Sequence, residues 1–309
     1  GAERPGGGVA PRATEGASPC QTTPTPARRE GQPDPHTRAR SALGSLPIRM
    51  EVPQMSWDLG CLGRNQAMRT ESFQVDPKCL KRAFPVRLLR YWFVYHLLRE
   101  ETERQGRPLR VAEVGIDTGQ MRFFLESIAK TPGAQPLATE RWTGIDLHLQ
   151  REFLEGLGYD HLVEANVEQD QSAIDPDTDA VILLHVLEHL YDPKEAMRKI
   201  AARLKPGAVL IGGFPSVPHW CAVFREPLIR LMPNENGHVS KFSPHRVRKL
   251  ARDLGLELDF FSGAFFLRAS GLFLEDNEAW IRFNLRFAQR FPGWPGETYW
   301  LMRVPRSGT

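Results

Sequence analysis

Residues 179–193 read DAVILLHVLEHLYDP and join a strongly apolar run to the start of a helix. The run Asp179–Leu184 predicts a strand covered on both faces, because it lacks the alternation of a half-exposed strand. The helix expected over Asp192–Leu204 begins with an aspartate that can cap it and a proline that suits its first turn. A further apolar run, Val209–Gly213, follows this helix. Strand, helix and strand in this order predict parallel strands joined by a crossover helix.

The same alternation extends in both directions from this unit. Apolar spacing predicts further helices over Val86–Glu103, Gln120–Lys130 and from Ser243 to about Leu254. Short apolar runs predict further strands over Arg110–Val114, Trp142–Asp146, His161–Ala165, Leu256–Phe261 and Thr298–Arg303. We therefore expect an α/β, Rossmann-like fold with a seven-stranded, mostly parallel sheet and helices on both of its faces.

Composition excludes several classes of protein. The chain has 309 residues and a formal charge of +3, from 40 basic and 37 acidic side chains, so it has no strong attraction for nucleic acid or an anionic membrane. No run of about 18 apolar residues is present, and we expect no membrane span. The amino end lacks the apolar core of a secretory signal. The four cysteines lie far apart and form no C-x-x-C pair, which is typical of reduced thiols and favours a cytoplasmic location. Oligomeric state is left open.

The chain divides into three predicted parts. Residues 1–47 are rich in Gly and Pro with few large apolar groups, so we expect disorder, because little burial offsets the entropy of ordering. Residues 48–105 are expected to be an N-terminal helical extension. The α/β domain is expected over 106–309, with insertions at 215–240 and 263–295. Aromatic side chains in these insertions predict either a lid over a substrate or simple packing on the domain. The second insertion carries an aromatic row and an arginine row at helical spacing: Trp280, Phe283, Phe287 and Phe291, and Arg282, Arg286 and Arg290.

Two further motifs follow the first and second predicted strands. Residues 111–119, VAEVGIDTG, place Gly115 and Gly119 in a turn where backbone amides can approach a ligand at a helix amino end. Such a turn also occurs in many α/β loops without a ligand. Asp146 closes the second strand, where a carboxylate can accept both hydroxyls of a ribose. The alternative is an ordinary solvated carboxylate.

Taken together, these segments resemble a known family. The LEHL turn after residue 186, the Asp-Pro-capped helix, the LKPG exit at 204–207 and the segment GHVSKFSP at 237–244 occur in the order and spacing of the class I S-adenosylmethionine-dependent methyltransferases. The chain is most similar to their small-molecule branch, which includes ubiquinone-biosynthesis O-methyltransferases. The resemblance covers roughly Arg110–Phe261.

The resemblance implies S-adenosylmethionine as the cofactor and assigns roles to its site residues. Around the methionine part it implies Glu113, Gly115 and Gly119. Asp146 matches the ribose-binding acid, Asn166 and Val167 stand near the adenine position, and His185 and Val186 line the pocket beside the sulfonium.

Asp117 departs from the family pattern, which usually has glycine at this position. A β-carbon there would crowd a close backbone approach. Its carboxylate can alternatively pair with the cofactor's amino group or cationic sulfur. If Asp117 instead weakens binding, the chain is a methyltransferase-like binding module without activity. A nicotinamide-dependent oxidoreductase is a further alternative, but the turn lacks G-x-G-x-x-G.

Methyl transfer is an in-line displacement, and we expect the acceptor to be an oxygen of a small molecule. A histidine suits the task of base for a hydroxyl acceptor. The candidates are His185, His219 and His238, each of which has an alternative role as a structural histidine. Relatives that bind a divalent cation carry Glu in place of His185, before Glu188 and His189. Because His185 removes a hard anionic ligand, we expect no metal and a structural role for these two residues.

Overall fold

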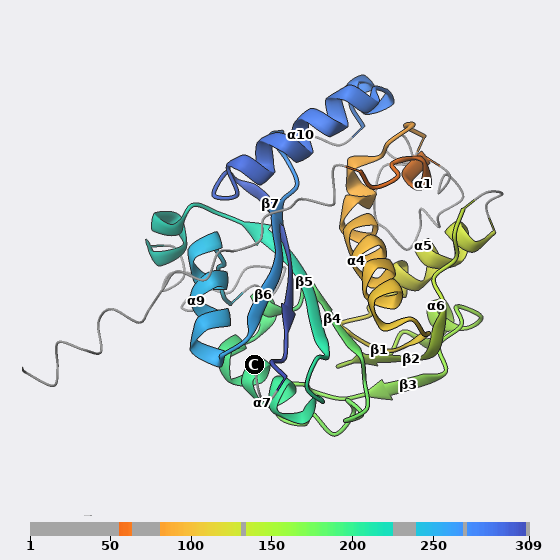
Figure 1. Cartoon of the computed structure of the whole chain (residues 1–309), viewed down its shortest axis with the longest axis vertical. Coiled ribbons are helices and arrows are strands. Elements are labelled where there is room, and N and C mark those ends of the chain that lie inside the picture. The colour runs from red at the N-terminus through yellow and green to blue at the C-terminus, as the bar shows by residue number, and fades with distance from the viewer. Residues whose placement is uncertain (1–55, 64–80, 131–133, 225–238, 268–270, 307–309) are drawn as a thin grey trace, which may run out of the picture. The chain divides into compact units, whose positions relative to one another are not determined.

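In the computed structural model all seven predicted strands pair in one sheet, in the order β3-β2-β1-β4-β5-β7-β6 (Figure 1). The structure describes residues 56–63, 81–130, 134–224, 239–267 and 271–306. All of these described residues belong to one compact unit. The segment 1–47, for which the sequence predicts disorder, lies outside the described residues.

The strands agree with the sequence prediction to within a few residues at each end. Their bounds are β1 (Leu109–Val114), β2 (Thr139–Asp146), β3 (His161–Glu164), β4 (Ala180–Leu184), β5 (Val209–Ser216), β6 (Glu257–Gly263) and β7 (Gly296–Arg303). Strands β1 to β5 pair in parallel, whereas β7 runs antiparallel to both β5 and β6. The expected mostly parallel seven-stranded sheet is confirmed.

The helices also form where the sequence places them. The longer ones are α4 (Leu89–Gln105), α5 (Gln120–Ala129), α7 (Pro193–Arg203), α9 (Pro244–Leu254) and α10 (Glu278–Arg290). The short ones are α1 (Gly60–Gly63), α6 (Arg151–Leu154) and the 3-10 turns η2 (Val86–Leu88), η3 (Leu187–His189) and η4 (Phe273–Asp276). The helix expected from Val86 therefore starts as a 3-10 turn. The Asp192 side chain accepts a hydrogen bond from the Glu195 amide at 3.0 Å, so the expected cap is present.

Side chains of the sheet alternate between two apolar layers. In β4, Ala180 and Ile182 pack in the layer that contains α4 and α5, whereas Val181 and Leu183 pack in the layer with α7 and α9. Figure 1 shows these helix pairs on opposite sides of the strands. Helices on both faces of the sheet are therefore confirmed, and the continuous apolar run in β4 is explained by burial from both sides.

The predicted N-terminal extension contributes to the first of these layers. Helix α4 contacts β4, β5 and β7, so it covers the sheet. Helix α10, from the second predicted insertion, contacts β6. Its aromatic row contacts Phe266 and Trp294, while Ile281 and Leu285 face the core. Part of the first insertion, 225–238, lies outside the described residues. In the described ranges, no helix combines the length and apolarity needed to cross a bilayer.

The strand order positions the site. After β1 the chain proceeds to β2 and β3 on one side, and it then returns to place β4 on the other side of β1. The connections that leave β1 and β4 therefore diverge at the carboxyl ends of these strands. Ligands in open α/β sheets bind in the crevice at such a switch point.

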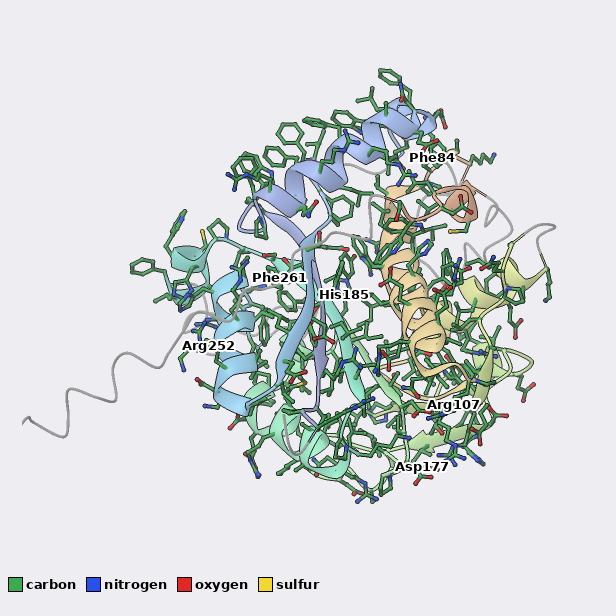
Figure 2. The ribbon with its side chains drawn as sticks, viewed as in Figure 1. Phe84, Arg107, Asp177, His185, Arg252 and Phe261 are labelled. Carbon is green, nitrogen blue, oxygen red and sulfur yellow. The ribbon has the colours of Figure 1, made fainter. Side chains whose placement is uncertain are left out.

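The opposite, amino end of the sheet is held by charged groups around Asp179. This side chain is fully buried; it accepts two hydrogen bonds from Arg107, at 2.9 and 2.5 Å, and pairs with Lys205 at 2.6 Å. Burial raises the pKa of Asp179, but the hydrogen bonds from Arg107 and Lys205 outweigh it and hold the pKa below its ordinary value. Figure 2 shows Arg107 well separated from His185, which follows β4 at the other end.

We predict that Asp179→Ala lowers the free energy of unfolding by about 2–4 kcal/mol, because Arg107 and Lys205 lose a buried partner. The matched control is Glu103→Ala, which breaks a surface pair with Arg99 and costs under about 1 kcal/mol. Denaturant titration of both variants measures the difference. Equal losses would show that Asp179 and its cationic partners do not stabilise the sheet.

Candidate functional site

A cavity of about 360 Å³ lies at the switch point of the sheet. Its walls come from the end of β1 and the turn after it, the first residues of α5, the residues after β4, and two residues of α4. Of the predicted site residues, Glu113, Gly115, Asp117 and His185 border this cavity. These residues are far apart in the sequence, and the parallel pairing of β1 with β4 brings them together.

The turn after β1 needs both of its glycines. Gly115 has a φ of 73°, and a β-carbon there would lie 2.6 Å from Cγ2 of Val186. Gly119 has a φ of 75° and precedes α5, and a β-carbon there would lie 2.5 Å from Cδ1 of Leu157. Left-handed backbone and close packing both exclude larger residues here. Gly115 therefore presents bare backbone to the cavity while Val186 packs behind it.

Asp117 also adopts the left-handed conformation, with a φ of 47°, which explains why glycine suits this position. Its carboxylate accepts a hydrogen bond from Nε2 of Gln150 at 2.7 Å. Partial burial and the nearby Asp146 carboxylate raise the pKa of Asp117. The backbone amide of Asp117 donates to Oδ2 of Asp146 at 2.8 Å. The two acids are thus adjacent, one in the cavity wall and one at the end of the neighbouring strand.

The remaining predicted residues that the structure describes lie outside the wall of this cavity. Asn166 uses its side-chain oxygen to accept from the Glu168 amide at 3.0 Å, and Val167 is buried in the apolar layer. His219 is exposed, with Nδ1 3.1 Å from Oγ of Ser243. His238 lies outside the described residues. The structure therefore does not bring His219 together with His185.

Glu113 is a buried carboxyl group at the end of β1. Its Oε2 accepts hydrogen bonds from Nε1 of Trp142 at 2.9 Å and from the hydroxyl of Tyr159 at 3.2 Å. Burial raises the pKa of Glu113 to about 7, although these two hydrogen bonds partly oppose the shift. The side chain is therefore locked against β2 while it borders the cavity.

His185 is held in an unusual backbone conformation. Its φ of 59° is rare for a residue with a β-carbon and costs about 1–3 kcal/mol. Ring atom Nδ1 lies 3.2 Å from Oε1 of Glu188, while Nε2 is buried without a hydrogen-bond partner. Such strain is stored where a site requires one orientation of a side chain. The strained turn after β4 thus fixes the ring at the cavity wall.

Sequence reasoning missed three polar residues at this site. Arg90 and Gln120 border the cavity, and Glu297 of β7 holds Arg90 through an ion pair of 2.9 Å. Burial lowers the pKa of Arg90, but Glu297 together with Tyr91, Tyr299 and Glu188 outweighs it and holds the pKa above its ordinary value, so the guanidinium stays charged. The arginine at position 90 interrupts a mainly apolar run of the predicted helix, and this was the sequence signal that could have indicated a functional residue. Its partner comes from the last strand, which no local pattern indicates.

The described residues contain no group of three or more His, Cys, Asp and Glu side chains placed to hold a metal ion. The Glu188 carboxylate is directed to His185, and the Glu188 carbonyl accepts from the amides of Val239 and Ser240 at 2.9 and 3.0 Å. His189 is exposed at the cavity rim.

We predict that Glu113 makes the stability of the protein fall with rising pH. Its folded pKa of about 7 exceeds its ordinary value of 4.5 in the unfolded chain, so its burial is least costly when it is protonated. Between about pH 5 and about pH 8 the wild type should lose about 2–3 kcal/mol relative to Glu113→Gln, which cannot ionise. Urea titrations of both proteins at several pH values measure this. Parallel stability curves would contradict a strongly shifted Glu113.

Comparison with known proteins places this geometry in a family. The family model for a methyltransferase domain matches residues 88–259, from the residue before α4 to the third residue of β6. Two ubiquinone biosynthesis O-methyltransferases, from Xanthomonas euvesicatoria pv. vesicatoria and Xanthomonas axonopodis pv. citri, are each 28% identical over 51% of this chain. These matches span 66% of each relative, just under two thirds of its length.

Solved structures show similarity at low sequence identity. A putative methyltransferase from Bacillus halodurans is 17% identical, with a TM-score of 0.44 over 68% of this chain and 99% of that one. The plantazolicin methyltransferase BamL, solved with SAH, is 12% identical, with a TM-score of 0.46 over 81% of this chain and 100% of that one. The family match covers more than half of the chain, and the chain therefore belongs to the class I S-adenosylmethionine-dependent methyltransferases.

Proposed function

We propose that this methyltransferase transfers a methyl group to a hydroxyl oxygen of a small molecule, with His185 as the general base. The observation that carries the proposal is the strained His185, whose unpartnered Nε2 lies at the wall of the switch-point cavity. The two similar Xanthomonas proteins, which are named O-methyltransferases, support an oxygen acceptor.

The residues around the cavity fit the cofactor that the family uses. Gly115 leaves backbone free for close approach, and Gln120 has a buried side-chain oxygen, Oε1, without a hydrogen-bond partner at the same wall. That oxygen is an acceptor suited to an ammonium group. The carboxylates of Glu113 and Asp117 add negative charge, which favours a cation. We assign the methionine part of the cofactor to this end of the cavity.

The nucleoside part is assigned to the neighbouring strands. Asp146 closes β2, one strand from the cavity, and its two oxygens accept from the Asp117 amide at 2.8 Å and the His148 amide at 3.3 Å. A carboxylate has further lone pairs for the two hydroxyls of a ribose. Asn166 and Val167 follow β3 and remain the proposed neighbours of the adenine.

The chemistry divides between the cofactor and the chain. When bound, S-adenosylmethionine supplies a methyl group already activated on a sulfonium. The chain therefore contributes alignment of the acceptor, removal of water and acceptance of a proton. His185 accepts the proton at Nε2, because its Nδ1 is directed to Glu188. His219 and His238 remain alternative bases, of which His219 is placed beside Ser243.

We predict that Asp146→Ala weakens binding of S-adenosylmethionine at least tenfold, or about 1.4 kcal/mol, because two charged hydrogen bonds are lost. Isothermal titration calorimetry of the full chain measures the affinity. The matched control is Glu152→Ala, which removes an exposed carboxylate of α6 shortly after β2 and should leave the affinity unchanged.

Two outcomes would contradict the proposal. Unchanged affinity in Asp146→Ala would remove this residue from the site. Binding of NADPH with an affinity equal to that of S-adenosylmethionine would favour a nicotinamide site. Transfer of a labelled methyl group to hydroxyl compounds, and its loss in His185→Ala with retained cofactor affinity, tests the role of the base.

A further inference from the structure

Three buried polar atoms of described residues at the cavity wall lack a hydrogen-bond partner. Gln120 Oε1 is assigned above to the cofactor's ammonium group, and the other two have opposite character. Arg90 Nε is a donor, and His185 Nε2 is the ring nitrogen opposite the one that faces Glu188. Both residues border the same cavity, one from α4 and one from the turn after β4. Buried polar atoms in folded proteins are normally paired, so an unpaired donor and an unpaired nitrogen at one wall indicate a ligand that serves both.

One carboxylate ties these two residues together. Glu297 accepts from Nη2 of Arg90 at 2.9 Å through Oε1, and its Oε2 lies 3.9 Å from Nε2 of His185, beyond hydrogen-bonding distance. The hydroxyl of Tyr299 donates to that same Oε2. Because both residues approach one carboxylate group, the guanidinium and the ring lie close to each other at this end of the cavity.

Glu188, which lies next to Nδ1 of His185, determines which of the two ring nitrogens carries the proton. A carboxylate only accepts hydrogen bonds, so Nδ1, 3.2 Å from Oε1 of Glu188, carries the proton of the neutral ring. Nε2 then has a free lone pair. The cavity wall therefore offers one N–H donor from Arg90 and one acceptor from His185.

We propose that Arg90 and His185 form a binding site for the hydroxyl group of the acceptor, with Glu188 and Glu297 as positioning residues; this rests on the proposed methyl transfer to oxygen. A hydroxyl donates one hydrogen bond and accepts two, so it satisfies both orphan atoms and keeps a lone pair for the methyl carbon. A neutral amine nitrogen has a single lone pair, which it cannot give both to Arg90 and to the methyl group. The site thus selects alcohols and phenols over amines.

The step balances with these residues alone. The acceptor oxygen forms its bond to the methyl carbon while the bond from that carbon to sulfur breaks, and the electron pair stays on sulfur. The hydroxyl proton moves to Nε2 of His185. The resulting imidazolium lies beside the carboxylates of Glu188 and Glu297, and Arg90 donates to the oxygen as its negative charge develops.

The first test reads the proton position in His185 directly. In the full chain labelled with ¹⁵N-histidine, long-range NMR spectra at alkaline pH should show His185 with Nδ1 protonated and Nε2 free, assigned by the loss of these signals in His185→Gln. In Glu188→Ala the preference for this tautomer should disappear, while the signals of the other histidines show that the fold persists. A neutral wild-type ring protonated at Nε2 would overturn the proposal.

The second test uses phenol, methoxybenzene and aniline as probes of the protein saturated with S-adenosylhomocysteine. Phenol should bind at least about tenfold more tightly than methoxybenzene, which lacks the O–H, and should shift the Nε2 signal of His185. Aniline should bind no better than methoxybenzene. Equal affinities, absent phenol binding or an unshifted His185 signal would each overturn the proposal.

A matched pair of variants on one helix assigns the donor. Arg90→Lys keeps the positive charge but removes Nε, so phenol affinity should fall about tenfold, whereas Arg99→Lys, which lies on α4 but does not border the cavity, should have no effect. Equal phenol affinity in Arg90→Lys and the wild type would remove Arg90 from the site. Binding of S-adenosylhomocysteine is measured first. If this compound does not bind, the proposed function is contradicted. If it binds but the protein does not prefer phenol to the other two probes, only the hydroxyl site is contradicted.

Discussion

The divergence of the connections after β1 and β4 is the constraint on which the site depends. In a parallel sheet each connection must cross to reach the next strand, and here one crosses toward β2 and the other toward β5. Neither covers the space between the two carboxyl ends, which leaves a cavity walled by the glycine turn and by His185. Helix α4 supplies a further wall, because it packs over β4, β5 and β7. The segment expected to be an extension is therefore part of the site.

Several carboxyl groups lie at the cavity or next to it, and each has a different hydrogen-bond or ionic partner. Glu297 is paired with Arg90, Glu188 faces His185, and Glu113 accepts from Trp142 and Tyr159. Burial without a full ionic partner raises the pKa of Glu113 to about 7, and burial with a nearby acid raises the pKa of Asp117. A bound cation would favour the ionised form of both groups. The glycine-turn end of the cavity is thus suited to a positively charged ligand, and the β7 end to a polar, uncharged group.

Part of the site was predictable because it is local in sequence. The glycine turn and the histidine after β4 each follow directly from a strand, and parallel strands bring their carboxyl ends to one edge. Asp146, the last residue of β2, lies at the same edge and is a proposed site residue. The residues at Arg90 and Glu297 were not predictable in this way. They are separated by 207 positions and meet only because β7 inserts between β5 and β6 while α4 crosses the sheet. Asp117 was recognised as a departure, and its φ of 47° explains why glycine is usual there.

The amino-acid sequence alone determined the alternation of strands and helices, since apolar spacing and capping residues act within a few positions of each other. It also determined the backbone turns, because glycines at 115 and 119 permit left-handed conformations that other residues resist. Only the tertiary structure decided which charged groups share a cavity, which nitrogen of His185 faces Glu188, and which polar atoms are left without partners. The physical reason is that burial and pairing of charges depend on contacts between distant segments, and local patterns carry no record of those contacts.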